Sequence, residues 1–149
     1  MTKKEFVSMS LPYGLKVVIP EYNANGCIKT VVGTVGVVFD DGSIHCYDTV
    51  NESPRWYKPI LYPIKMLRKD IEFNRKAINP ISWLEDEYYS LDLYRQAKIL
   101  LMDARYINQS DFMLVKHMVE WHFDIAGLIS KGQAIDVNTL KVNPYKKSI

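Results

Sequence analysis

Three residues in one predicted helix have the types and the spacing of metal ligands. His117, Glu120 and Asp124 lie at positions i, i+3 and i+7, which places an imidazole and two carboxylates on one helix face. A metal site would also need His or Cys ligands from a second helix, and the sequence offers no helix with that pattern. The same spacing is typical of the solvated face of an amphipathic helix. We therefore predict no metal ligands and no cofactor.

His122 is a second candidate, because it falls within the apolar stripe of the same predicted helix, between Trp121 and Phe123. A buried neutral imidazole needs a hydrogen-bond partner, so this side chain either pins the helix to a neighbouring sheet or lines a pocket. No Gly-x-Ser-x-Gly motif is present to supply a nucleophile. Trp121 and His122 are therefore candidate binding residues, and no catalytic residues are predicted.

Two further patterns with possible chemistry have simpler explanations. Glu85, Asp86 and Glu87 are adjacent on one predicted helix and point in different directions, whereas catalytic carboxylate pairs converge from separate elements. Carboxylates near the start of a helix interact favourably with the helix dipole, which explains their presence here. Gly33-Thr34-Val35-Gly36 lies within a predicted strand rather than before a helix, so it does not form a phosphate-binding loop. These patterns predict a protein that is not an enzyme.

Aromatic and basic residues alternate in Arg55-Trp56-Tyr57-Lys58. Such a segment on a small barrel could stack on single-stranded bases, or its rings could pack on the sheet. The net charge of +2 is far below that of a dedicated DNA-binding domain. Ten tyrosines, by contrast, suit protein contact. A protein partner and a nucleic-acid partner both stay open.

Length and composition indicate one domain over residues 1–149, with 48% hydrophobic residues. Cys27 and Cys46 are typical of buried, reduced thiols in a cytoplasmic protein. No apolar run approaches the roughly 18 residues that a membrane span requires. We expect a cytoplasmic protein without membrane contact.

Residues 1–62 have mainly β patterns. Leu15, Val17 and Ile19 share one face of a strand that ends at Pro20. Asp41-Gly42 predicts a two-residue type I′ hairpin, with Gly33 and Gly36 suited to a bulge. This hairpin would place on one face Val37, Phe39, Ile44 and Cys46. Residues 55–58 could add an edge strand. The result is a small antiparallel sheet or an SH3-like open barrel.

Residues 63–132 have mainly helical patterns, and residues 133–149 are expected to form an extended tail. A short helix follows Pro63, and the capping box Ser82 to Glu85 opens a second helical region that could break near Ser90. Its apolar stripe consists of Leu93, Ala97, Leu100 and Ala104. A long helix runs from Ser110-Asp111 to Gly132. Its apolar face consists of Val115, Met118, Val119, His122, Ile125, Ala126 and Ile129. The two long helices form an antiparallel helical pair, so the fold class is α+β.

Two segments resemble a known group of proteins. The carboxyl-terminal segment is Glu120-Trp121-His122-Phe123-Asp124, continuing through Gly127-Leu128-Ile129 to Asn138-Thr139-Leu140, and the other is Leu11-Pro12-Tyr13-Gly14-Leu15-Lys16. Both resemble small uncharacterised accessory proteins of phages and prophages of gut Bacteroidales. Where those proteins tend to carry Asn-Gly, this chain has Asn74-Arg75. The resemblance implies a viral accessory protein inside an infected bacterium and supplies no catalytic residues.

Together these observations predict a non-enzymatic, phage-type accessory protein that binds a host or viral protein. One alternative is a nucleic-acid or nucleotide-binding module that uses the barrel surface around Arg55, Trp56, Tyr57 and Lys58. Another is an inhibitor of a bacterial antiviral defence system. Homo-oligomer formation and association with the virion stay open.

Overall fold

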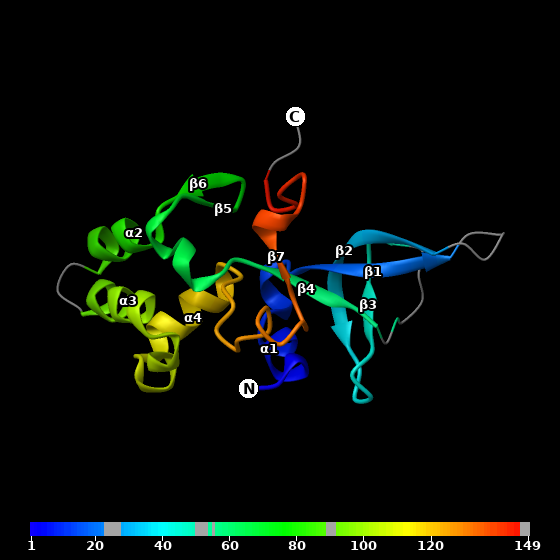
Figure 1. The fold of residues 1–149 in the computed structure, drawn as a ribbon, viewed down its shortest axis with the longest axis horizontal. Coiled ribbons are helices and arrows are strands. Elements are labelled where there is room, and N and C mark those ends of the chain that lie inside the picture. Colours follow the sequence, from blue (N-terminus) through cyan, green and yellow to red (C-terminus); the bar gives the residue numbers. More distant parts are fainter. Residues whose placement is uncertain (23–27, 50–53, 55, 89–91, 147–149) are drawn as a thin grey trace.

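A five-stranded sheet with the strand order β3-β2-β1-β4-β7 runs through the molecule (Figure 1). The computed structural model describes residues 1–22, 28–49, 54, 56–88 and 92–146. The strands are β1 (Lys16–Tyr22), β2 (Ile28–Val38), β3 (Ile44–Cys46), β4 (Lys58–Leu61) and β7 (Ile135–Asp136). All pairs are antiparallel except β4 with β7, which is parallel. The α+β class is confirmed, and over the described residues the sheet does not close into a barrel.

Strand β1 has the predicted alternation, since Leu15, Val17 and Ile19 are all fully buried. It does not end at Pro20, however, but continues to Tyr22. Cross-strand pairs in an antiparallel ladder alternate between hydrogen-bonded and non-hydrogen-bonded. Val35 N–H donates to Leu15 O over 3.0 Å, so counting along the register makes Pro20 and Thr30 a non-hydrogen-bonded pair. The missing N–H of proline therefore removes no bond to β2.

The hairpin at Asp41-Gly42 is confirmed, but its predicted turn type and register are wrong. Phe39 N–H donates to Ser43 O over 2.8 Å, and of the two turn residues only Gly42 has a positive φ, of 87°. This longer loop moves the pairing, so that Val38 lies opposite Ile44, and a bulge follows between Val35 and Val37. Ile44 is consequently buried, whereas Phe39 and Val37 are more than 40% exposed.

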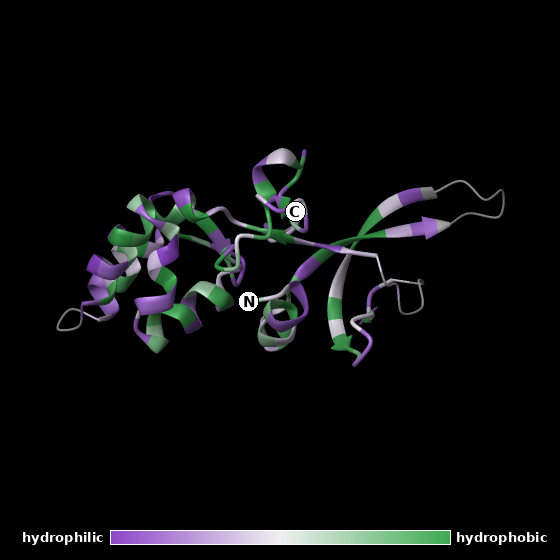
Figure 2. Ribbon diagram, turned by 60° about the horizontal axis from the view of Figure 1, so that its bottom comes forward, coloured by the Kyte–Doolittle hydropathy of each residue, from purple (hydrophilic) through white to green (hydrophobic). Residues whose placement is uncertain are grey.

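Strand β4 is not the predicted edge strand, because it lies between β1 and β7. It divides two cores. The β-side core contains helix α1 (Lys3–Met9), β1 to β3 and the side chains of Tyr57 and Leu61. The helical core contains the helices after residue 63 and the side chains of Ile60 and Tyr62. Successive strand side chains point to opposite faces, so this one segment serves both cores. Hydrophobic segments run through both halves in Figure 2.

The helical half consists of short elements: η2 (Ile64–Arg68), α2 (Pro80–Glu87), α3 (Leu93–Met102), η3 (Ala104–Gln109) and α4 (Phe112–Glu120). A hairpin of β5 (Ile71–Phe73) and β6 (Lys76–Ile78) precedes α2. Asn79, not Ser82, caps α2, because its side chain accepts from the Ser82 N–H. The predicted stripe is buried at Leu93, Ala97 and Leu100 but not at Ala104, which is exposed in η3. Residues 89–91, including the predicted break near Ser90, lie outside the described residues.

The predicted long helix from 111 to 132 is wrong, because α4 ends at Glu120. His122 has a φ of 63°, in the left-handed region that ends helices. Its carbonyl accepts from Tyr62 N–H over 2.8 Å, and Asp124 N–H donates to Tyr62 O over 2.9 Å. Tyr62, the residue after β4, thus hydrogen-bonds to the backbone of residues 122–124, and these residues cannot continue the helix. The antiparallel pairing of two helices stays a prediction.

Residues after 133 return to the sheet and insert a tyrosine between two strands. Beyond β7 and η4 (Val137–Thr139), the Tyr145 hydroxyl accepts from Lys16 N–H over 3.1 Å and donates to Ile60 O over 2.7 Å. In the register of β1 with β4, Lys16 and Ile60 would be the next pair after Val17 and Pro59. A side-chain hydroxyl therefore takes the place of a ladder bond where β1 and β4 separate.

Candidate functional site

The predicted binding residues do not come together in one site. Trp56 is 50% exposed and Lys58 half-buried, but Tyr57 lies in the β-side core, where Lys3 Nζ is 4.1 Å from its ring centroid. Arg55 lies outside the described residues. Trp121 is buried in the helical core. Because Tyr57 faces the core, the predicted pair of stacking aromatics is reduced to Trp56.

His122 is buried, and it lines neither of the two hollows described below. Its Nε2 lies 2.8 Å from the Tyr13 carbonyl oxygen, and its ring stacks on Tyr145 with 4.3 Å between centroids. A carbonyl only accepts, so Nε2 carries the proton and Nδ1, which is buried without a partner among the described residues, is bare. Burial lowers the pKa of His122 to about 4. His122 is therefore neutral, and it packs in the interior beside the sheet.

The expected solvated face of His117, Glu120 and Asp124 is wrong. Asp124 is buried, and its carboxylate accepts from the Leu128 and Ile129 N–H groups over 2.7 and 3.0 Å. These bonds fix the turn after α4, where a longer helix would have placed the side chain in solvent. No group of three or more potential metal ligands occurs within the described residues.

His117 belongs to a buried aromatic cluster that joins α2 to α4. Its Nε2 lies 2.8 Å from the Tyr88 hydroxyl, and its Nδ1 lies 3.2 Å from a carboxylate oxygen of Glu120. The ring stacks on Trp121 at 5.3 Å and meets Trp83 edge-on at 5.0 Å. A carboxylate, an imidazole and a hydroxyl in series can act as a nucleophile relay. Neither Tyr88 nor His117 lines any of the hollows described next, so we assign the cluster to packing.

The surface of α4 offers a different kind of site. Leu114 and Met118 point into the helical core, while Phe112, Val115 and Val119 line a hollow of about 270 Å³ on another side of the same helix. Met9 at the end of α1 and Tyr13 form the opposite wall. Phe112 is 76% exposed at the rim. This hollow is called the first hollow.

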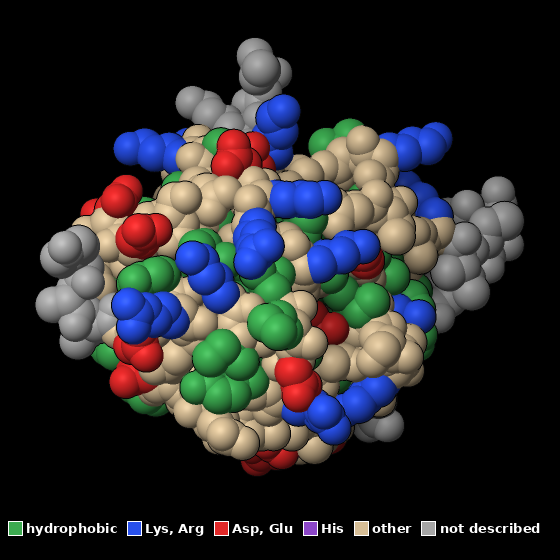
Figure 3. Space-filling view, turned by 60° about the vertical axis from the view of Figure 1, so that its left-hand side comes forward, with side chains coloured by type: hydrophobic (Ala, Val, Ile, Leu, Met, Phe, Trp, Pro, Cys, Tyr) green, Lys and Arg blue, Asp and Glu red, His purple; other side chains and the backbone are tan. Residues whose placement is uncertain are grey.

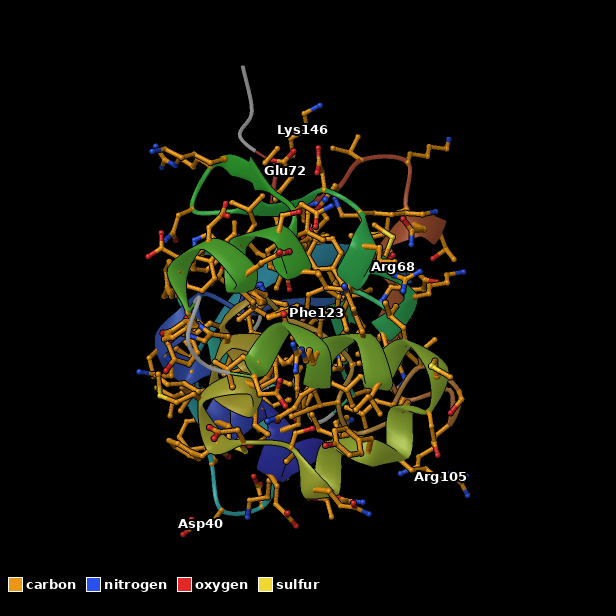
Figure 4. The ribbon with its side chains drawn as sticks, turned by 90° about the vertical axis from the view of Figure 1, so that its left-hand side faces the viewer. Asp40, Arg68, Glu72, Arg105, Phe123 and Lys146 are labelled. Atoms are coloured by element: carbon orange, nitrogen blue, oxygen red, sulfur yellow. The ribbon has the colours of Figure 1, made fainter. Side chains whose placement is uncertain are left out.

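A second hollow, of about 340 Å³, lies beyond Val115, which lines both. Its apolar lining includes Ile107 of η3, Ile125 and Ala126, and Arg105 and Asp124 are its charged lining residues. The two hollows together are called the α4 face. Figure 3 shows the helical side of the molecule, with hydrophobic side chains among both basic and acidic ones. In Figure 4, Arg105 projects at the lower end of this half, away from Phe123 at its centre.

The sequence contains a pattern that could have predicted the α4 face. Phe112, Val115 and Val119 lie at i, i+3 and i+7, which is the spacing of a helix face. The apolar face predicted for this helix contains Val115, Met118 and Val119. Met118 and Val119 are buried as predicted, whereas Val115 is only partly buried. Leu114, which the prediction omits, lies in the helical core.

No protein family model, no curated protein and no solved structure matches this chain. None of the helices in the described ranges has the length and hydrophobicity needed to cross a membrane. The function is therefore argued from the chain's own geometry.

Proposed function

We propose that this protein is a non-enzymatic, phage-type accessory protein of the bacterial cytoplasm that binds a host or viral protein through the α4 face. One observation carries the proposal: α4 is apolar on two sides. A surface helix needs one apolar side to pack on its own domain, and a helix that is apolar all round is normally buried. The second side, at Phe112 and Val115, borders two hollows instead of a core.

The composition of the α4 face supports a protein as the bound molecule. The first hollow is bordered by Phe112, Met9 and Tyr13, residue types that are enriched in protein interfaces. The aromatic side chain at its rim, Phe112, is 76% exposed, and an aromatic side chain is the kind of residue that dominates binding energy when a partner buries it. An inhibitor of an antiviral defence system would be one form of this function, distinguished only by the identity of the bound protein.

The proposal is tested by photocrosslinking in a Bacteroidales host during phage infection. A photoreactive phenylalanine at position 112 is expected to give one adduct of constant mass, and the same group at Tyr47, which is 70% exposed in the strand half, is not. The protein in the adduct is then purified. Phe112→Ser should weaken its affinity at least about tenfold, in the range of interface anchors.

Phe39→Ser is the matched control, since Phe39 is an exposed phenylalanine in the strand half. The proposal is wrong if the purified protein binds the Phe112 and Phe39 variants equally well. It is also wrong if the chain instead binds single-stranded DNA or RNA with a salt dependence that Trp56→Ala removes, because the site would then be the surface of Trp56 and Lys58.

A further inference from the structure

We infer that the occupant of the α4 face is a partner segment with two apolar side chains flanked by carboxylates. This inference rests on the proposed function and specifies the chemistry of the bound protein. Its first basis is the division of the face by Val115. Two hollows of about 270 and 340 Å³ lie on either side of this residue, so each can receive one apolar side chain of the same segment.

The second basis is the charge that the face leaves unsatisfied. Lys116 is the charged residue that lines the first hollow, it is exposed, and it has no ion-pair partner among the described residues. Lys131 reaches the edge of the second hollow, where its Nζ lies 3.3 Å from Ala126 O. Both lysines can therefore meet carboxylates of a bound segment.

The acidic residues at the same surface are already engaged. Asp124 is buried and binds two backbone N–H groups. Asp103 forms a two-pronged contact with Arg105, with N–O distances of 3.0 and 3.1 Å. Asp111 caps α4 by accepting from Met113 N–H over 2.8 Å. Bonds to neutral N–H groups leave the carboxylates of Asp124 and Asp111 charged but occupy their oxygens, whereas Lys116 and Lys131 have no ion-pair partner among the described residues. A segment that complements these two lysines carries carboxylates.

The same charges argue against a second copy of this chain as the occupant. In a two-fold dimer the same patch lies on both sides of the interface, so Lys116 and Lys131 of one copy would approach a surface whose charges without ion pairs are again these lysines. Like charges across an interface weaken association. A carboxylate-bearing segment of another protein avoids this repulsion.

The test selects binders from a random linear peptide library displayed on phage, using the whole chain. Peptides that bind wild type but not Phe112→Ser are retained. We expect them to share two apolar positions with adjacent Asp or Glu. Lys116→Glu should lower the affinity of the protein for such a peptide by about tenfold. Replacing the peptide's acidic residues with Lys should restore its affinity for the Lys116→Glu variant. Unfolding temperatures of the variants check that these exposed substitutions leave the fold intact.

Each outcome has a separate meaning. Peptides that depend on Phe112 but ignore the Lys116 charge reversal would overturn the acidic segment and leave docking at the α4 face intact. Peptides that bind the Phe112→Ser variant as well as wild type, or no enrichment at all, would contradict the proposed function itself. A concentration-dependent dimer in sedimentation that Phe112→Ser abolishes would identify a second copy as the occupant and also overturn the inference.

Discussion

The two cores of this protein are built in different ways. The β-side core takes its side chains from alternate positions of long strands, such as Leu15, Val17 and Ile19 of the β1 segment. The helical core is assembled from short helices and from residues after the end of α4, including Trp121 and Phe123. Strand alternation repeats over two residues and is a local property, whereas the end of a helix depends on what binds its backbone.

The segment around β4 is where the two kinds of core meet. Its neighbouring residues Ile60 and Leu61 are both fully buried, one in each core. Its backbone also receives β7 on one side and the Tyr145 hydroxyl on the other. We therefore expect the two halves to depend on each other for stability although they are packed differently.

The largest expected effect comes from truncating β4 on either face. Ile60→Ala and Leu61→Ala should each lower the free energy of unfolding by about 2–5 kcal/mol, because each leaves a cavity in a different core. Since both cores share this strand, each variant should show one transition at the same midpoint by tryptophan fluorescence and by far-ultraviolet circular dichroism. Val142→Ala, at an exposed position, is the neutral control. Two separate transitions would show that the halves are independent folding units.

Acid should lower the free energy of unfolding through His122, which lies between Tyr13 and Tyr145. Its pKa is about 4 in the folded chain and about 6.5 when unfolded, so below pH 6.5 the unfolded state binds the extra proton. This histidine's contribution is therefore complete above pH 6.5 and declines as the pH falls towards 4, by roughly 3 kcal/mol in all. Urea unfolding at several pH values measures the slope.

His122→Asn tests whether His122 causes this loss of stability in acid. Asn is suited to the test because it tolerates the left-handed backbone at this position. This variant should lose the part of the pH dependence between 6.5 and 4, whereas His45→Gln, at an exposed histidine of the strand half, should keep it. If both variants retain the wild-type slope, a different group controls the acid sensitivity.

A smaller effect is expected from the tyrosine between β1 and β4. Tyr145→Phe leaves Lys16 N–H and Ile60 O without their hydroxyl partner and should cost about 1–3 kcal/mol. Tyr47→Phe, at an exposed ring, should change stability by less than about 0.5 kcal/mol. Chemical unfolding of both variants measures the difference. Equal stability of the two would mean that the hydroxyl adds nothing to the junction.

The smallest effect, and a stabilising one, is expected in the β5–β6 hairpin of the helical half. Asn74 and Arg75 have φ values of 50° and 64°, so both occupy the left-handed region of a two-residue turn. Arg75→Gly should relieve strain and raise stability by about 0.5–1 kcal/mol. Asn74→Gly should gain less, because Asn already tolerates this conformation. A destabilised Arg75→Gly variant would show that the arginine side chain contributes contacts that outweigh the strain.

Much of the strand half was predictable from local patterns. The buried face of β1, a hairpin at Asp41-Gly42 and the burial of Cys46 all follow from alternation and turn chemistry. Burial also raises the pKa of the Cys46 thiol to about 11, as expected of an unreactive cysteine. Cys27 lies outside the described residues. The hairpin register was missed because a loop one residue longer reverses which side chains face the core.

Less of the helical half and of the candidate site was predictable. In the helical half, the end of the last long helix and the cap of α2 were predicted wrongly. Helix α1 of the β-side core was not predicted either, although Thr2 caps it and it buries Phe6 and Val7. The binding residues were predicted from their types, and three of the five that the structure describes are buried. Tyr57, Trp121 and His122 have the same residue types on a surface or in an interior, and sequence spacing alone does not distinguish these environments.

Local patterns are enough to predict the α+β class, the buried face of β1 and the starts of η2 after Pro63 and of α4 at Asp111, because each depends on residues close together along the chain. Where α4 ends, which of its sides is buried and which borders the hollows depend on long-range contacts. Those outcomes depend on Tyr62 binding the backbone of His122 and Asp124 from about sixty residues away, a hydrogen-bonding choice that no local pattern encodes.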